Sequence, residues 1–326
     1  MKQRRLGKCG VKVTEVGLGC WQLAGDWHPV SESEAVAILK SAVDEGIRFF
    51  DTADVYGNGM SEHLIGRFLK DCPEPIFVAT KVGRGGAIYP DHYSLKTVTQ
   101  HIEGSLQRLG VEVLDLVQLH CVPTAVLQRG DIFGWLDILQ EQGKILRWGA
   151  SVETVDEALL CMEQPHLVSL QIILNCLRQK PVETILKVAE RLGTGIIVRL
   201  PLASGLLSGK FNAETRFGEK DPRQYNKDGE CFNVGEIFGG LPFDRGLAAV
   251  EQIRPWIPEG MTMAQMALRW LLDFEAVTTV IPGATRVEHV RSNAAASSLA
   301  PLPSGLHMKL RDLYWDQVHD HIRGGY

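Results

Sequence analysis

The sequence predicts one α/β domain over residues 1–326, a (β/α)8 barrel with an N-terminal β-hairpin and a long loop after the seventh strand. Eight short apolar runs without polar alternation are typical of parallel strands that are covered on both faces. A segment with helical periodicity follows each run. This repeated alternation favours a barrel over a doubly wound sheet.

The elements can be assigned in chain order. Glycines at a turn within residues 4–13 predict the hairpin. The first helix is the clearest, because Ser31 or Ser33 can cap its start and Gly46 can end it. The strands are expected at 15–18, 47–51, 76–81, 114–120, 146–151, 167–173, 195–200 and 277–281, and the helices at 33–45, 61–69, 94–109, 132–142, 154–163, 182–192, 263–272, 287–296 and 304–321.

Residues 206–242 form the predicted long loop, which is rich in Gly, Asn and charges of both signs. It lies between the seventh strand and the main helix that follows that strand. A loop of this length in a compact domain is usually a lid, a binding loop or a disordered segment.

The composition excludes several classes of function. With 45% hydrophobic and 22% charged residues, the chain is typical of a globular protein with a full core. The net charge of −5 gives no nucleic-acid footprint. No apolar run reaches the ~18 residues of a membrane span, and the basic N-terminus lacks the apolar segment of a signal peptide. Seven scattered cysteines fit reduced thiols in the cytoplasm and predict no metal site, while the oligomeric state stays open.

Polar residues end strands that are otherwise apolar. Taken singly, each could be a helix cap, a solvated strand end or a satisfied core group. In a barrel, however, all strands end at one rim, where the chemistry of such barrels lies. We therefore expect one site formed by Tyr56, five residues beyond the second strand, and by the strand-end residues Asp51, Lys81, His120, Ser151, Gln171 and Arg199.

The residue types in this set suit the protonation of a carbonyl oxygen. A tyrosine hydroxyl has a reference pKa near 10, and an adjacent ammonium such as Lys81 lowers it. Asp51 can hold that lysine in place, and a neutral His120 can orient the carbonyl by hydrogen bonding. No side chain delivers hydride, so a nicotinamide cofactor is implied.

Six motifs in this order resemble the aldo-keto reductase superfamily, and the resemblance covers nearly the whole chain. The stretch 51–57, DTADVYG, resembles the D-T-A-x-x-Y-G motif of that family. The others are ATKVG at 79–83, SLQRLG at 105–110 with DLVQLH at 115–120, GKI at 143–145 with GAS at 149–151, PLASGLLSGK at 201–210, and IPGA at 281–284.

The resemblance implies a role for each site residue. Tyr56 would be the general acid, Lys81 its partner, Asp51 the partner of Lys81, and His120 the group that orients the carbonyl. Ser151 and Gln171 would bind the nicotinamide carboxamide, and backbone between 202 and 207 would cradle the pyrophosphate. The other implied cofactor residues are Gly19, Cys20, Trp21, Arg199, Pro201, Leu202, Ser204, Gly205, Leu207, Lys210, Gly283, Thr285, Arg286, His289 and Asn293.

The resemblance also implies NADPH as the cofactor, because Arg286 and His289 suit a 2′-phosphate. No G-x-G-x-x-G motif opens a helix after a strand, so no Rossmann domain is expected. Two positions depart from the family pattern, in which Asn often stands at Val152 and an aromatic ring at Arg199. A guanidinium can stack on the nicotinamide, and we hypothesise that its charge disfavours the oxidised cofactor and biases the protein toward reduction.

Aromatic residues near the rim predict an apolar pocket for a small carbonyl substrate. Trp21, Trp27 and Tyr89 would line it beside Tyr56, although plain packing explains them equally well. We therefore predict NADPH-dependent reduction of aldehydes or ketones to alcohols. Two alternatives stay open, an alcohol or sugar dehydrogenase on the same fold, and a slow nicotinamide-binding regulatory subunit like the β subunits of potassium channels.

Overall fold

The computed structural model describes residues 1–25, 27 and 30–326, and its centre is a closed parallel barrel. The sheet runs in the order β10-β9-β8-β7-β6-β5-β4-β3 with every pairing parallel. Parallel bridges between Val16 and Val280 and between Gly19 and Gly283 join its two edges and close the barrel. The strands are β3 (Leu18–Gly19), β4 (Phe49–Asp51), β5 (Phe77–Val82), β6 (Leu116–His120), β7 (Trp148–Ser151), β8 (Ser169–Ile173), β9 (Gly195–Arg199) and β10 (Val277–Val280).

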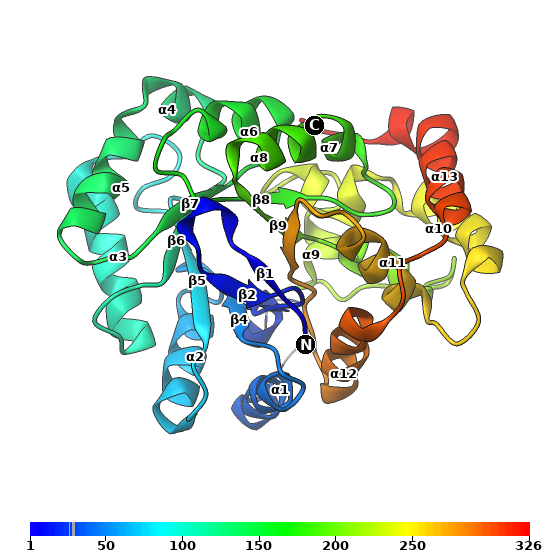
Figure 1. Cartoon of the computed structure of the whole chain (residues 1–326), viewed down its shortest axis with the longest axis horizontal. Coiled ribbons are helices and arrows are strands. Elements are labelled where there is room, and N and C mark those ends of the chain that lie inside the picture. The colour runs from blue at the N-terminus through cyan, green and yellow to red at the C-terminus, as the bar shows by residue number, and fades with distance from the viewer. Residues whose placement is uncertain (26, 28–29) are drawn as a thin grey trace.

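Helices surround this barrel on the outside (Figure 1). Those that follow the strands are α1 (Glu32–Asp44), α2 (Met60–Asp71), α3 (Leu95–Leu109), α5 (Asp131–Glu141), α6 (Val155–Met162), α8 (Ile185–Leu192), α11 (Met263–Leu272) and α12 (Val287–Ala295). Four of them, α1, α3, α6 and α11, begin with a capping box, in which the N-cap hydroxyl accepts from the N3 amide. Among the residues described, no helix combines the length and apolarity needed to cross a membrane.

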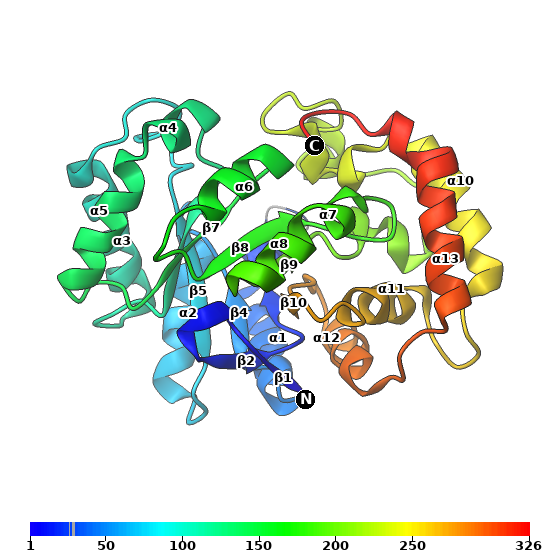
Figure 2. The same ribbon diagram turned by 45° about the horizontal axis from the view of Figure 1, so that its top comes forward.

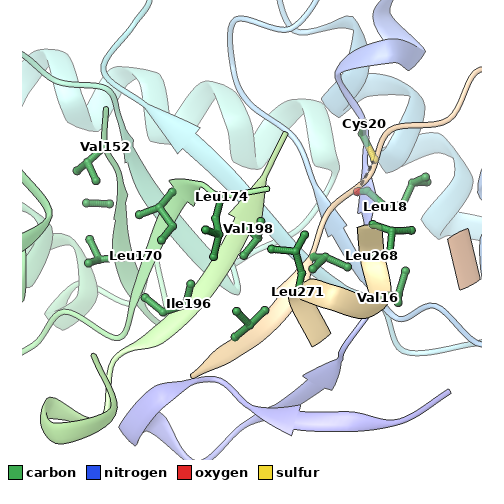
Figure 3. Close-up of a cluster of buried hydrophobic side chains, with 14 of the residues drawn as sticks. Val16, Leu18, Cys20, Val152, Leu170, Leu174, Ile196, Val198, Leu268 and Leu271 are labelled. Carbon is green, nitrogen blue, oxygen red and sulfur yellow. Dashed lines mark hydrogen bonds between the residues drawn. The ribbon is translucent and has the colours of Figure 1, made fainter. Parts of the chain in front are cut away.

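Two apolar layers follow from the alternation of side chains along the strands. Residues such as Leu170, Ile196 and Val198 point outward and pack against the helices, together with Leu268 and Leu271 of α11 (Figure 3). The residues next to them in sequence point to the barrel axis. There, a second cluster of Phe49, Ala79, Leu116, Val168, Ile197 and Ile281 fills the N-terminal half of the barrel.

The hairpin closes the N-terminal end of the barrel. Its strands, β1 (Gln3–Arg5) and β2 (Lys12–Thr14), pair antiparallel, as the sequence predicts. Leu6 and Val13 are buried in the axial cluster. The hairpin, drawn in blue, lies across this N-terminal end (Figure 1). This end is therefore plugged, and only the opposite end remains for a site.

The fold agrees with the predicted class but differs in several elements. The structure adds α4 (Thr124–Arg129) and α10 (Phe243–Ile253), which the sequence analysis did not predict. The helix predicted at 182–192 is split at Thr184 into α7 (Lys180–Glu183) and α8. The helix predicted at 304–321 is regular only as α13 (Ser304–Leu313), then widens into a π-helical turn at Tyr314–Val318 and ends in a 3-10 turn at His319–His321. The helices α13 and α10 lie side by side (Figures 1 and 2).

The long loop is folded rather than extended. It contains the short helix α9 (Pro222–Tyr225) and 3-10 turns at Val234–Glu236 and Phe238–Gly240. The C-terminal tail holds it in place, because Arg323 donates to the carbonyls of Lys227 and Gly240 and pairs with Asp228 at 2.7 Å. The tail and this loop lie together at one edge of the molecule (Figure 2).

Candidate active site

The alternation that builds the core also brings the predicted polar residues to one rim. In β6, Val117 and Leu119 pack outward against the helices, so Gln118 and His120 face the axis. The same alternation turns five further strand-end side chains inward, all buried, above the apolar axial cluster. They are Asp51 in β4, Lys81 in β5, Ser151 in β7, Gln171 in β8 and Arg199 in β9, with His120 beside them.

Asp51, Lys81 and Tyr56 form one hydrogen-bonded chain. The Lys81 ammonium donates to Asp51 Oδ1 at 2.5 Å, to the Thr52 carbonyl at 2.7 Å and to the Tyr56 hydroxyl at 3.1 Å. Its three N–H groups are therefore all used. Tyr56 lies in the loop between β4 and α2, and its position is thus fixed by a lysine on the neighbouring strand.

Burial and charge act on the acid in opposite directions. Burial raises the pKa of the Tyr56 hydroxyl, Lys81 lowers it, and the net pKa lies above its usual value. The pKa of Lys81 is also raised, because Asp51 and Tyr56 outweigh the effect of burial. The sequence analysis anticipated only the lowering effect of Lys81. The structure instead gives a tyrosine that keeps its proton at neutral pH and can donate it.

His120 faces Tyr56 and stays neutral. The two rings lie edge to face, with centroids 5.8 Å apart. Burial and the nearby cations Arg84, Lys81 and Arg199 hold the pKa of His120 well below its usual value. Within the described structure Nδ1 has no hydrogen-bond partner. A proton on Nε2 is therefore favoured, and that N–H can donate to a carbonyl oxygen.

Two side-chain amides, those of Gln118 and Gln171, bind the carboxylate oxygen of Asp51 that does not face Lys81. Gln118 was not predicted from the sequence. Asp51 Oδ2 accepts from Gln171 Nε2 at 2.7 Å and from Gln118 Nε2 at 3.2 Å. Gln171 Nε2 also donates to Gln118 Oε1 at 3.3 Å, and Ser151 donates to Gln171 Oε1 at 3.5 Å. Both N–H groups of Gln171 are thus used inside the protein, and its carbonyl oxygen and Ser151 remain for a ligand.

Aromatic rings form one wall of the site. Trp21 stacks on Tyr56 with centroids 5.5 Å apart and meets Trp27 edge to face at 5.0 Å. Phe232, from the long loop, lies 6.1 Å from Trp21 and was not predicted. Tyr89 is 44% exposed, and the described ring contacts of Trp21 and Tyr56 do not include it. The structure therefore brings two of the three predicted aromatics to Tyr56.

Ion pairs form a second wall, which meets the aromatic wall at Phe232. Glu236 of the long loop accepts from Arg84 at 2.7 Å and lies 3.3 Å from Arg199, and all three are largely buried. Burial alone would raise the pKa of Glu236, but the two guanidiniums hold it below the usual value. Arg199 also donates to the Val152 carbonyl at 3.2 Å. The charge that we expected Arg199 to present is thus partly offset by Glu236.

The two cysteines next to rim residues are buried thiols. Burial raises the pKa of Cys121 to about 12, and it raises the pKa of Cys20 further. A raised pKa disfavours the reactive thiolate.

The segment after β9 and the start of α12 can hold phosphates. Leu200, Ala203, Ser204 and Gly205 have φ values of 52°, 48°, 53° and 99°. In this turn the amides of Ala203 and Gly205 donate to the carbonyls of Leu200 and Leu202, so an anion would bind only to amides that the turn leaves free. The N-cap of α12, Arg286, makes no side-chain cap, and the His289 amide donates to the Arg286 carbonyl, so the amides of Val287 and Glu288 are the ones that an anion could reach.

Basic side chains gather at this second end. Arg286 lies 3.3 Å from His289, and Thr285 lies 3.4 Å from the other ring nitrogen. Burial, Arg286 and Lys210 lower the pKa of His289, so Lys210 belongs to the same cluster.

Gly19 and Cys20 lie beside the eighth strand, since Gly19 forms the closing bridge to Gly283. Asn293 is buried on α12. The C-terminal mouth of the barrel thus holds a proton donor, and anion-binding groups lie on one side of this mouth.

This arrangement can be compared with known proteins. The aldo/keto reductase family profile matches residues 15–314. This chain belongs to the aldo/keto reductase family. It is 32% identical over 300 residues to the probable aldo-keto reductase 1 of Glycine max, covering 90% of this chain and 83% of that protein.

Two further similar proteins carry more specific names, a channel subunit and a dehydrogenase. Over 319 residues the chain is 29% identical to a probable voltage-gated potassium channel subunit beta of Arabidopsis thaliana, covering 93% of each chain. The structure matches the glycerol dehydrogenase AKR11B4 from Gluconobacter oxydans with a TM-score of 0.79 and 27% identity, covering 99% of this chain and 98% of that chain. As a member of the aldo/keto reductase family, the protein is an oxidoreductase with a nicotinamide cofactor on a (β/α)8 barrel.

Proposed function

We propose that this aldo/keto reductase reduces aldehydes and ketones to alcohols with NADPH, and that Tyr56 is the general acid. The observation that carries the proposal is the hydrogen-bonded chain from Asp51 through Lys81 to Tyr56, with neutral His120 facing the tyrosine. Because the pKa of Tyr56 is raised, the hydroxyl is protonated at neutral pH and is ready to donate. This favours the reductive direction.

The residues fit a nicotinamide dinucleotide. The cofactor supplies the hydride to the carbonyl carbon. Ser151 and the Gln171 carbonyl oxygen would bind the carboxamide, the turn from Leu200 to Gly205 the pyrophosphate, and the start of α12 the adenosine end. NADPH is preferred over NADH in this proposal because Lys210, Arg286 and His289 gather where a 2′-phosphate would need cations. Trp21 and Trp27 would line the substrate pocket, with Tyr89 at its outer edge.

In the proposed reaction His120 and Tyr56 act on the same oxygen. The His120 Nε2–H donates a hydrogen bond to the substrate carbonyl and orients it. Tyr56 gives its proton to that oxygen as negative charge develops on it, and the adjacent ammonium of Lys81 stabilises the phenolate left behind. Asp51 keeps Lys81 charged and in place, and the amides of Gln118 and Gln171 fix Asp51. The buried, unreactive cysteines suit the reducing cytoplasm, where we place the enzyme.

The first prediction tests this assignment with Tyr56→Phe. The ring and its stacking on Trp21 are kept, and only the acidic proton is lost, so kcat for an aldehyde panel should fall by about 10²–10⁴-fold. The dissociation constant of NADPH, measured by fluorescence, should stay within a few-fold. NADPH oxidation at the wild-type rate would overturn the role of Tyr56.

The same measurements separate the two alternatives that the likenesses raise. An oxidative dehydrogenase, as the likeness to a glycerol dehydrogenase suggests, would show a kcat/KM for alcohols with NADP⁺ above that for aldehydes with NADPH. A regulatory subunit, as the likeness to a potassium channel β subunit suggests, would bind NADPH tightly and turn over no aldehyde of the panel.

A further inference from the structure

The ion pairs of Arg84 and Arg199 with Glu236 contain positive charge that the proposed proton transfer does not use. Arg84 follows β5 and Arg199 ends β9, so the barrel itself fixes both guanidiniums at the rim. Both contact the same oxygen, Oε1 of Glu236. Neither arginine is needed to deliver the proton of Tyr56.

Much of the hydrogen-bonding capacity of these arginines is unused. A guanidinium carries five N–H donors in a planar fork that suits bidentate binding of a carboxylate. Within the described chain, the side chain of Arg84 makes one hydrogen bond, to Glu236, and approaches Glu153 only at 4.0 Å. Arg199 Nε is buried and has no acceptor among the residues described. The cluster can therefore accept a further or larger anion.

The cluster lies close to the position of the reacting carbonyl. Arg199 lies 3.6 Å from the sulfur of Cys121, the residue after His120. Arg84 lies 5.3 Å from the ring centroid of Phe232, which packs on Trp21 beside Tyr56. Both cations also lower the pKa of His120. A carbonyl oxygen held between Tyr56 and His120 therefore lies near both guanidiniums. A second functional group of the substrate, a few carbons from the carbonyl, would reach them.

A metal ion is the weaker choice for this position. Cys121, Glu153 and Glu236 offer ligand atoms within 4.8 Å of one another. However, the two guanidiniums that already pair with Glu236 would repel a cation. The pKa of Glu153 is raised by burial and by Glu236, which leaves that carboxyl a poor ligand. Of the two carboxyl groups, Glu236 pairs closely with both guanidiniums, whereas Glu153 approaches Arg84 only at 4.0 Å, so an anion is favoured here over a cation.

We propose that Arg84 and Arg199 form a subsite for the carboxylate of a short-chain oxo acid, and that Glu236 fills this subsite until such a substrate binds. Glu236 is suited to this exchange because the long loop carries it, whereas Arg199 ends β9 and Arg84 lies two residues after β5. The carboxylate of the incoming substrate takes the place of the Glu236 carboxylate, so the two arginines stay paired throughout. Arg199 can present the edge of its guanidinium to the carboxylate and a face to the nicotinamide. This proposal rests on the proposed reductase function.

The test compares 4-oxobutanoate with its methyl ester, which has the same aldehyde and lacks the charge. Wild-type kcat/KM should be about tenfold or more higher for the acid, as expected for a charge-assisted pair of hydrogen bonds. In Arg84→Met the ratio of acid to ester should fall to about one. In Glu236→Gln it should rise, because a neutral amide competes less for the guanidiniums. Each ratio is taken within one variant, so a general loss of folded enzyme cancels.

A matched control is Arg216→Met, an exposed arginine of the same loop that bonds only to the carbonyls of Ala213 and Thr215. It should leave the wild-type ratio unchanged. A wild-type ratio of one or less would overturn the proposal, and so would an Arg84→Met variant that keeps the preference for the acid.

A binding experiment separates this proposal from the proposed function. Calorimetry with the full chain compares 4-hydroxybutanoate with butane-1,4-diol, neither of which needs to react. Tighter binding of the acid that is lost in Arg84→Met supports the subsite even if no aldehyde is reduced. Reduction of uncharged aldehydes with no such difference in binding would refute the subsite alone.

Discussion

At the scale of single residues, opposing effects set the protonation of Tyr56, the general acid that we propose. Burial keeps the proton on Tyr56, while Lys81 stabilises the phenolate that follows its loss. Lys81 can do so only because Asp51 keeps it charged in a buried position, against the effect of desolvation. The pair therefore gives a donor that is protonated before the reaction and stabilised after it.

The second prediction concerns His120, whose pKa is lowered in the folded protein. Below pH about 6.5 the unfolded chain binds a proton at this residue and the folded chain does not. The contribution of neutral His120 to the free energy of unfolding is therefore complete above that pH. It decreases as the pH falls toward the pKa of the folded state, by at most about 1.4 kcal/mol per pH unit. Urea unfolding at pH values of about 6.5 and 5.5 measures this loss.

The comparison is with His120→Asn, which keeps the other titrating groups. The wild type should lose about 1 kcal/mol more than this variant over that interval. Equal losses in the two proteins would show that His120 is not held neutral.

At the scale of elements, the long loop completes the site that the strands begin. The Ser204 hydroxyl donates to the Glu236 carbonyl at 3.2 Å and accepts from the Phe238 amide at 3.1 Å. Asn233 donates to Glu153 at 2.9 Å. These bonds attach the loop to the segment after β9 and to the end of β7. Its side chains then supply both an aromatic and a charged group to the rim.

The third prediction follows from Phe232, which connects the two walls of the site. Its ring lies 6.1 Å from Trp21, and the Arg84 guanidinium lies 5.3 Å from its centroid. Phe232→Ala removes both contacts, and with them about 1–2 kcal/mol of interaction free energy on this side of the pocket. KM for 4-nitrobenzaldehyde should therefore rise about 5–30-fold at saturating NADPH, with a smaller change in kcat.

Phe217→Ala serves as the control for this loop. Phe217 packs on Phe211, Phe238 and Phe243, and its described ring contacts do not include Trp21. Its loss should lower stability and change KM less. Equal effects of both substitutions on KM would mean that Phe232 acts only through the folding of the loop.

The elements differ in how well the sequence predicts them, for physical reasons. Fully buried parallel strands are continuous apolar runs, so the strand ends Asp51, Lys81 and His120 could be located. Gln118 lies inside such a run, and only the alternation counted back from His120 indicates that it faces the axis. Glu236 and Phe232 had no signal, because a long loop has no periodicity, and contacts with distant segments decide its path. The helix α10 differs from that loop, because its buried residues Gly246, Ala249, Val250 and Ile253 follow a helical spacing that the sequence does carry.

At the scale of the whole molecule, the two ends of the barrel have separate tasks. The mouth carries buried charges that would be costly without their partners. The other end is closed by the hairpin and by the axial cluster of large apolar side chains. Stability at the closed end can therefore be changed without touching the chemistry.

The last prediction tests this separation with Arg4→Met. The Arg4 guanidinium donates to three carbonyls between the end of α11 and the start of β10, those of Leu272, Phe274 and Val277. It also pairs with buried Glu15 at 2.8 Å. Its loss leaves Glu15 with fewer partners. It also removes the charge-assisted hydrogen bonds of the guanidinium at the closed end of the barrel. The free energy of unfolding in urea should fall by about 2–4 kcal/mol.

The neighbouring Arg5 provides the matched control, since its side chain is exposed. Arg5→Met should change the free energy of unfolding by about 0.5 kcal/mol or less. Both variants should keep the wild-type kcat/KM at a temperature where they are folded, because the hairpin and the catalytic rim lie at opposite ends of the barrel. If Arg4→Met lowered kcat/KM as much as stability, the hairpin would have to communicate with the mouth through the axial cluster, and the two ends would not be independent.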